Sequence, residues 1–248
     1  MGSLILAVRF LTIIPVPGRE RSGPGALGQA AWWFPAVGLG LGAALAALDR
    51  ALALALPPLS SAVLVVTAWK LGTGGIHLDG LADSLDGLGG ANAERRLAIM
   101  RDSRIGVFGA IGLIAYFLIQ VSALADVPTP RRSAMLCLAP MVGRLAPLLL
   151  APCFPAATAR GSGARFLAAV PPLAGPANLI GALALALALL GPAGSALSAA
   201  AVGASFGWAA FATGRFGGLT GDSLGAAVEL AELAFVVVGA SFVHVRLL

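Results

Sequence analysis

Long apolar runs without charged residues restrict the fold of this chain more than any other feature. The stretch LIGALALALALL, at Leu179–Leu190, belongs to one of several runs that reach about 20 residues, the length that crosses a bilayer as a helix. Inside lipid, only helices and closed β-barrels satisfy their own backbone hydrogen bonds, and barrel strands alternate apolar with polar residues. The runs here are continuous, so the sequence predicts an all-α, polytopic integral membrane helix bundle.

The composition indicates the same class of protein. Hydrophobic residues make up 58% of the chain and charged residues only 11%, whereas soluble domains carry about 25% charged residues. The formal net charge of +5 is explained by arginines in cytoplasmic loops, which are typical of membrane proteins. We therefore expect the lipid bilayer, and no nucleic acid, as a partner.

Proline, glycine and charged residues divide the chain into about six or seven predicted transmembrane helices, which form a single domain over residues 1–248. The N-terminal segment has an apolar stretch that is interrupted by Arg9 and has no convincing cleavage site. It is therefore predicted to lie at the membrane interface rather than to be a cleaved signal. The predicted spans are 31–48, 51–70, 106–126, 134–151, 172–191, 194–213 and 229–247.

The distribution of arginines predicts the orientation, because cytoplasmic loops of membrane proteins are enriched in Lys and Arg. With seven spans and a cytoplasmic N-terminus, the segments 71–104 and 214–228 both face the cytoplasm. The arginines on that side are then Arg9, Arg19, Arg21, Arg95, Arg96, Arg101, Arg104, Arg160, Arg165 and Arg215. Those on the opposite side are Arg50, Arg131, Arg132 and Arg246.

The segment GGIHLDGLADSLDGLGG, at Gly74–Gly90, concentrates acidic residues in a chain that has 11 Asp and Glu in total. Asp79, Asp83 and Asp86 are spaced i, i+4, i+7, which places their carboxylates on one face of a helix. Carboxylates this close repel one another unless a cation lies between them. Mg²⁺ and Mn²⁺ prefer oxygen ligands and also bind substrate phosphates, so we expect these three aspartates to be metal ligands.

Other interpretations of this segment stay open. The aspartates could form a solvated helix face at the membrane edge, with Gly74 and Gly75 preceding the helix N-terminus. An EF-hand is a poorer fit, because the pattern D-x-[DN]-x-[DN]-G is absent. His77 precedes Asp79 by two residues, so on a continuous helix it points away from the acidic face. It could bind phosphate, transfer a proton, cap the helix or have a purely structural role.

The basic stretch RRLAIMRDSRIGVFG follows directly, at Arg95–Gly109. Its first two arginines are interpreted as membrane anchors. Arginine side chains bind phosphate oxygens with two parallel hydrogen bonds, and we expect this role for Arg101 and Arg104, which flank Asp102 and Ser103. Carboxylates for a metal ion, followed by arginines for phosphate, are typical of phosphoryl transfer.

A second polar segment, GRFGGLTGDSLGAAVELAE, lies at Gly214–Glu232. Charged residues at membrane depth are costly and mark candidate functional sites, which makes Arg215, Asp222 and Glu229 candidates for substrate binding. For Asp222, which follows a glycine and precedes a serine, a helix N-cap is an equally good interpretation. The predicted topology places this segment on the same side of the membrane as the acidic one, so the two can cooperate.

Three motifs in order resemble the adenosylcobinamide-GDP ribazoletransferase family, also called cobalamin 5'-phosphate synthase. They are GGIHLDGLADSLDG, IMRDSRIGVFG and GGLTGDSLGAAVELAE, and the N-terminal RFLTIIPVPG and WWFPAVGLGLG resemble that family's opening. The resemblance covers about residues 9–232. It implies a polytopic, Mg²⁺-dependent protein of the bacterial cytoplasmic (inner) membrane, whose active site we expect to face the cytoplasm.

The resemblance also implies a reaction, the late nucleotide-loop assembly step of cobalamin biosynthesis. Adenosylcobinamide-GDP is the donor, α-ribazole or α-ribazole 5'-phosphate is the acceptor, and GMP leaves to give adenosylcobalamin or its 5'-phosphate. Metal ions at Asp79, Asp83 and Asp86 would stabilise the charge that grows on GMP. Asp102 and Asp86 are the candidates to position or deprotonate the acceptor hydroxyl. The candidate substrate-binding residues are His77, Arg101, Ser103, Arg104, Arg215, Asp222 and Glu229.

Two alternative functions remain. DSLDG, at Asp83–Gly87, opens like the D-x-x-D-G motif of CDP-alcohol phosphotransferases, which act on lipid head groups. The following LGGAN, however, lacks that family's Ala-Arg pair, and its later aspartates are also missing. An ion-coupled secondary transporter would also use buried aspartates, but transporters usually show repeated halves, and no internal repeat is evident. A homo-oligomeric state is left open by the sequence.

Overall fold

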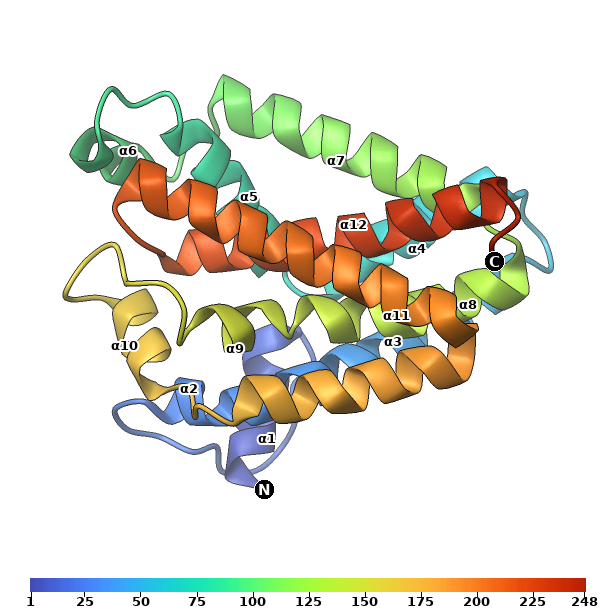
Figure 1. Cartoon of the computed structure of the whole chain (residues 1–248), viewed down its shortest axis with the longest axis horizontal. Coiled ribbons are helices and arrows are strands. Elements are labelled where there is room, and N and C mark those ends of the chain that lie inside the picture. The colour runs from blue at the N-terminus through green and yellow to red at the C-terminus, as the bar shows by residue number, and fades with distance from the viewer.

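The computed structural model describes residues 1–248 and is built from helices without a β-sheet (Figure 1). Its one β-type contact is an isolated bridge between Ala156 and Leu219. This confirms the predicted all-α fold. The helices are α1 (Gly2–Leu11), α2 (Ala26–Ala30), the 3₁₀ helix η1 (Ala31–Trp33), α3 (Phe34–Leu52), α4 (Pro58–Gly72), α5 (Ile76–Gly87), α6 (Ala93–Ile99), α7 (Val107–Ala125), α8 (Thr129–Gly143), α9 (Ala146–Leu150), α10 (Ser162–Ala169), α11 (Ala174–Phe216) and α12 (Gly221–His244).

The long apolar helices run roughly along the longest axis of the molecule (Figure 1). Five segments are long and apolar enough to cross a membrane, and a sixth crossing arises if the bent pair α4 and α5 counts as one span. These lengths and compositions confirm the prediction of a polytopic membrane bundle. The five segments are Ala26–Leu52, Val107–Ala125, Thr129–Leu150, Ala174–Phe216 and Gly221–His244.

The longest helix, α11, consists of two helical limbs. At Gly191 the backbone leaves the helical conformation, with φ 62° and ψ −155°, and Pro192 follows directly. Glycine adopts positive φ without steric cost, and proline lacks the N–H that would continue the helix. Figure 1 shows α11 running to one end of the molecule and then back. The predicted spans 172–191 and 194–213 correspond to these two limbs.

The predicted span 51–70 is wrong at its start. Helix α3 continues to Leu52, and α4 begins only at Pro58, where a proline fits the first turn of a helix because its missing N–H is not needed there. The chain then bends by 90° between α4 and α5. This span is therefore shorter than predicted and is broken.

The predicted start of the last span, at residue 229, is also wrong. Helix α12 begins at Gly221, where the side chains of Thr220 and Ser223 form a capping box. Such reciprocal bonds satisfy backbone donors at the helix start. The prediction began the span at Glu229 and left Asp222 outside it, whereas the structure includes Asp222 in the first helical turn.

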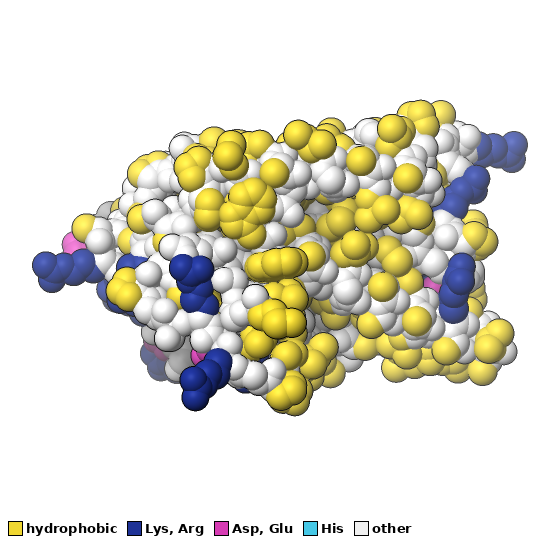
Figure 2. All heavy atoms as spheres, turned by 90° about the horizontal axis from the view of Figure 1, so that it is seen from below, with side chains coloured by type: hydrophobic (Ala, Val, Ile, Leu, Met, Phe, Trp, Pro, Cys, Tyr) yellow, Lys and Arg dark blue, Asp and Glu magenta, His cyan; other side chains and the backbone are white.

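Loops and charged side chains are concentrated at the two ends of the molecule. Short helices and loops at 12–25, 88–106, 151–172 and 216–220 gather at one end (Figure 1). The turns at residues 53–57, 126–128 and 191, together with the C-terminus, gather at the other end. Figure 2 shows Lys and Arg side chains at both ends and mainly hydrophobic side chains between them. The charged side chains in this view are therefore concentrated at the ends of the bundle rather than along its middle.

Helices α3 and α8 pack closely through glycines. A Cβ atom on Gly38 would lie 2.5 Å from the carbonyl oxygen of Pro140, and one on Gly42 would lie 2.5 Å from that of Cys137. Carbon and oxygen atoms do not approach this closely without a shift of the backbone. Small residues therefore allow these two helices to touch, as is common in membrane bundles.

Replacing Gly42 by alanine should destabilise the protein by about 1–3 kcal/mol, because the added methyl group overpacks the contact with α8. Thermal unfolding in detergent measures this loss. Gly40→Ala is the matched control, since a Cβ atom there meets nothing within 4 Å. Both changes raise helix propensity by a similar amount, about 1 kcal/mol, so equal unfolding temperatures for the two variants would contradict the packing described here.

Candidate active site

The acidic face, formed by Asp79, Asp83 and Asp86, lies on a helix that turns away from its predecessor. Gly74 and Gly75 link α4 to α5 with φ values of 62° and 69°, a conformation that favours glycine. Helix α5 then continues without interruption to Gly87, so the i, i+4, i+7 spacing places the three aspartates on one face. Asp79 is exposed, and the other two are half-buried.

The start of α12 packs directly against α5. A Cβ atom on Gly80 would lie 2.6 Å from the carbonyl oxygen of Asp222, and one on Gly225 would lie 3.2 Å from the Cα atom of His77. Both glycines therefore allow the two helices to meet through their backbones. The structure brings together the two polar segments that the sequence predicted to lie on one side. Thr220 provides the N-cap of α12, so the N-cap interpretation of Asp222 is wrong.

Four carboxylates gather where α5 and α12 meet. The Asp83 carboxylate lies within charge–charge range of Asp79, Asp86 and Asp222. None of the four forms an ion pair with a Lys or Arg of the chain. Like charges at this spacing favour a bound cation between them.

The side chains around the acidic face do not form a complete metal cage. No three His, Cys, Asp or Glu side chains lie close enough together to hold one metal ion, so the three predicted ligands do not converge on a single point. Mg²⁺ usually binds through one or two carboxylates together with water and substrate phosphates. The unpaired carboxylates of Asp79, Asp83 and Asp222 suit that mode of binding, in which phosphates complete the coordination.

Asp86 is held by the first turn of α7. Its carboxylate accepts hydrogen bonds from the backbone N–H groups of Gly106, at 2.7 Å, and Gly109, at 2.8 Å. The first N–H groups of a helix have no partner within the helix and favour a negative charge. The end of the basic stretch is thereby joined to the acidic face, and the Asp86 side chain is fixed in position.

Replacing Gly109 by alanine should lower kcat by about tenfold or more, because a displaced catalytic group commonly costs that much. The added Cβ atom would collide with the Asp86 carboxylate and lie 3.0 Å from the carbonyl oxygen of Ala82. Steady-state turnover measures the loss, and Gly207→Ala is the control, because a Cβ atom there meets nothing within 4 Å. Unchanged kcat in Gly109→Ala would show that the position of Asp86 does not matter for turnover.

The basic loop after α6 is open to solvent. Arg104 donates to both carboxylate oxygens of Asp102, and the closest ion-pair distance is 2.7 Å. Hydrogen bonds from the Arg104 side chain and backbone lower the pKa of the Asp102 carboxyl to about 2. Arg101 and Ser103 are also exposed. In this conformation Asp102 orients Arg104, and both predicted arginines can reach a ligand from solvent.

Arg215 lies beside the same loop. The Arg96 side chain donates a hydrogen bond of 3.0 Å to the carbonyl oxygen of Arg215, so α6 is tied to the end of α11. The guanidinium of Arg215 lies 5.3 Å from the centre of the Phe211 ring, a cation–π contact. Arg215 is exposed and near the other predicted phosphate-binding arginines along this end of the bundle.

Glu229 lies in a buried network rather than at an open surface. It is 1% exposed, and its carboxylate accepts hydrogen bonds from Lys70 at 2.5 Å and from Tyr116. Lys70 also pairs with Glu232 at 2.8 Å, and Glu232 pairs with Arg144. Two cations balance two anions, which is the arrangement that buried charges require. Direct substrate binding by Glu229 stays a prediction, and any such contact would first have to open this network.

Sequence reasoning missed three members of this network. Lys70 and Arg144 each interrupt an apolar run, as in TAWKLG and MVGRLAPLLL, and single cations within predicted spans are rare and usually paired. That rule was available from the sequence and would have marked both residues. Tyr116 carried no comparable signal, because a tyrosine in an apolar helix is common at membrane interfaces.

A cavity of about 230 Å³ opens next to the site. His77 from α5 and Asp222 from α12 both line it, and the remaining wall is largely apolar. The structure therefore places the predicted substrate-binding residue His77 at an enclosed space, away from the acidic face, as its position in the helix indicated.

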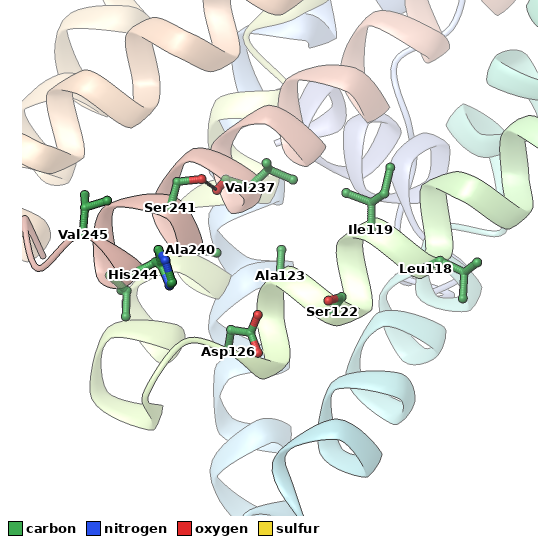
Figure 3. A pocket seen from close by; sticks show the side chains of 11 residues that line it. Leu118, Ile119, Ser122, Ala123, Asp126, Val237, Ala240, Ser241, His244 and Val245 are labelled. Atoms are coloured by element: carbon green, nitrogen blue, oxygen red, sulfur yellow. Dashed lines mark hydrogen bonds between the residues drawn. The ribbon is translucent and has the colours of Figure 1, made fainter.

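A larger open pocket, of about 780 Å³, lies at the opposite end of the molecule. Figure 3 shows it between the ends of α7 and α12, with Ser122 and Asp126 on one side and Ser241 and His244 on the other. None of the predicted site residues lines it. Of the two spaces, only the smaller cavity is lined by predicted site residues, namely His77 and Asp222.

The chain is similar to a well-defined set of known proteins. A family model described as cobalamin-5-phosphate synthase matches residues 3–240. An adenosylcobinamide-GDP ribazoletransferase from Roseiflexus sp. (strain RS-1) is 38% identical over 234 residues, with 92% of this chain and 85% of the relative covered. The protein of that name from Synechococcus elongatus (strain ATCC 33912) is 40% identical over 237 residues, with 91% of each chain covered. No solved structure matches the chain.

Proposed function

The chain belongs to the cobalamin-5-phosphate synthase family, and on that basis we propose that it joins adenosylcobinamide-GDP to α-ribazole, or to α-ribazole 5'-phosphate, with release of GMP. The product is adenosylcobalamin or its 5'-phosphate. The observation that carries the proposal is the contact between α5 and α12, which gathers four unpaired carboxylates beside an exposed arginine loop. This arrangement suits the transfer of a substituted phosphate group.

The reaction needs one bond to form and one to break at the same phosphorus atom. A ribose hydroxyl oxygen that is free in both acceptor forms attacks the phosphorus that carries the cobinamide arm, and the bond from that phosphorus to the oxygen shared with the GMP phosphate breaks. The acceptor hydroxyl loses its proton, and GMP leaves with the electron pair of the broken bond. Negative charge therefore grows on the leaving phosphate, and it must be stabilised.

We assign metal binding, phosphate binding and orientation of the acceptor hydroxyl to different residues of the site. Asp79 and Asp83 would hold Mg²⁺, or Mn²⁺, jointly with the donor phosphates, and the ion would supply positive charge on the leaving side. Arg101 and Arg104 can reach the remaining phosphate oxygens from the solvent side. Asp86, fixed by the first turn of α7, is the better of the two predicted groups to orient the acceptor hydroxyl, because both oxygens of the Asp102 carboxylate already accept hydrogen bonds from Arg104.

The arginine-rich end of the molecule is proposed to face the cytoplasm of a bacterial cell, with the protein in the inner membrane. Ten of the 16 Lys and Arg residues were assigned to this end from the sequence, and four to the other. Cytoplasmic loops carry such an excess of positive charge. The site then opens to the compartment that contains nucleotides.

A GMP-release assay tests the proposal. Purified protein in detergent is incubated with adenosylcobinamide-GDP and α-ribazole, first with Mg²⁺ and then with EDTA. We expect GMP release that requires both the acceptor and the metal ion. Release that continues in EDTA would reject the metal requirement alone. No release with either acceptor form, under any divalent cation, would reject the transferase, and CDP-activated lipid and ion transport in vesicles would be tested next.

A further inference from the structure

The cavity of about 230 Å³ has an aromatic wall. Phe10, Phe34 and Phe166, from α1, α3 and α10, all line it. Their rings are stacked, with Phe34 in the centre: the ring centres lie 5.8 Å apart for Phe10 and Phe34 and 6.0 Å apart for Phe34 and Phe166, and the planes differ by 18° and 13°. A row of near-parallel rings favours a flat apolar ligand.

One polar side chain of the cavity lining is buried. His77 is 7% exposed, and its Nδ1 atom has no hydrogen-bond partner. Buried polar atoms of proteins are nearly always paired, so a partner is missing at this point. His77 and Gly225 both line the cavity, where the two helices meet through their backbones. The remaining polar side chains of the wall, Ser162 and Asp222, are exposed and half-buried, respectively.

We propose that this cavity binds the heterocyclic base of the ribazole acceptor, with His77 donating a hydrogen bond to the free ring nitrogen of that base. The assignment rests on the proposed function. The base of ribazole is a flat, methylated benzimidazole with a single ring nitrogen that is not bonded to the sugar. His77 is the one fully buried polar side chain of this largely apolar cavity, which matches a ligand with one acceptor atom.

The other substrate groups fit less well. A guanine base carries several donors and acceptors, and an apolar wall would leave most of them without partners, which is unfavourable. The corrin ring system is too large, because this cavity lies below the range of about 300–1,000 Å³ that is usual for sites that take a whole ligand. With the base inside, the ribose lies toward Asp222, and its attacking hydroxyl can face the carboxylates where α5 and α12 meet.

Narrowing the cavity provides the first test. Leu27 lines it, and Leu27→Trp should raise the KM for α-ribazole roughly tenfold or more, as loss of fit in an apolar pocket does. The KM for adenosylcobinamide-GDP should stay within about twofold of wild type. Leu59→Trp is the matched control, because Leu59 is exposed on α4 and should leave both values unchanged. An equal rise in both KM values, or no rise in either, would place the base elsewhere.

The hydrogen bond is tested with two acceptors. The first is α-ribazole, and the second is the α-riboside of 5,6-dimethylindole, in which a C–H group replaces the free ring nitrogen. His77→Ala should raise the KM for α-ribazole several-fold and leave the KM for the indole riboside unchanged. His77→Asn keeps a hydrogen-bond donor and should therefore restore part of the affinity for α-ribazole. Equal effects of His77→Ala on both acceptors would overturn the hydrogen bond.

Binding without turnover separates this inference from the proposed function. Calorimetry with α-ribazole alone should show binding to the wild type and weaker binding to Leu27→Trp. A wild type that releases GMP while both proteins bind α-ribazole equally would overturn the base site and leave the transferase intact. A wild type that binds α-ribazole, and binds it less well after Leu27→Trp, but releases no GMP would reject the transferase and retain the site.

Discussion

Replacing Asp83 by asparagine should lower kcat on the order of 10³-fold, the loss that follows removal of a group that stabilises transition-state charge. Asparagine has the same shape but no charge. Asp83 lies within charge–charge range of Asp79, Asp86 and Asp222, so its loss weakens the attraction of the whole cluster for a cation. Turnover in the GMP-release assay, at several Mg²⁺ concentrations, measures the effect.

Asp126→Asn provides the control for this change. Asp126 lies at the opposite end of the molecule, in the open pocket of Figure 3, and the same loss of charge there should leave kcat unchanged. Thermal unfolding in detergent shows whether either variant has lost its fold. If Asp83→Asn keeps its fold and more than a tenth of wild-type turnover, the carboxylate cluster is not the metal site.

Replacing Glu232 by leucine should destabilise the protein by about 3–5 kcal/mol, the usual cost of removing one partner of a buried ion pair. Glu232 is fully buried and pairs with both Lys70 and Arg144. Leucine cannot accept a hydrogen bond, so the guanidinium of Arg144 would remain charged and without its partner inside the bundle. A large fall in the unfolding temperature in detergent is the expected result.

The double variant Arg144→Met with Glu232→Leu separates charge from packing. Removing both partners leaves Lys70 paired with Glu229 at 2.5 Å, so the interior stays neutral. Replacing a whole ion pair by apolar residues is often neutral in its effect on stability, and most of the lost stability should return. If the double variant is as unstable as Glu232→Leu alone, the leucine has disturbed packing, and charge balance is not the cause.

The acidic face could be predicted from the sequence because its members are close along the chain. The i, i+4, i+7 spacing of Asp79, Asp83 and Asp86 needs only a helix to place them together, and the structure provides that helix. For Asp222, the sequence predicted only that it lies on the same side of the membrane as the acidic face. Its contact with α5 depends on Gly80. Nothing in the sequence pairs that glycine with a residue more than 140 positions later.

The buried network and the cavity could not be predicted in the same way. Arg144 and Glu232 belong to different apolar helices, and their pairing follows from how α8 and α12 pack, which hydropathy does not specify. Phe10, Phe34 and Phe166 likewise come from three separate helices and form one stack only in the folded chain. The start of the last span was wrong because Asp222 was assumed to lie outside it, whereas α12 begins at Gly221.

The buried network also has a consequence for how the protein is assembled during synthesis. Lys70 enters the membrane on α4 and Arg144 directly after α8. Both acids that neutralise them are on α12, and Lys70 precedes its two partners by 159 and 162 residues. Until α12 is inserted, the growing chain therefore carries two cations at membrane depth without counter-ions, which lipid disfavours. We therefore expect the early helices to remain bound to the insertion machinery, or only loosely packed against one another, until α12 is inserted and completes the bundle. A chain that ends before α12 would keep Lys70 and Arg144 unpaired in the membrane, and membrane quality control can recognise such unpaired charges.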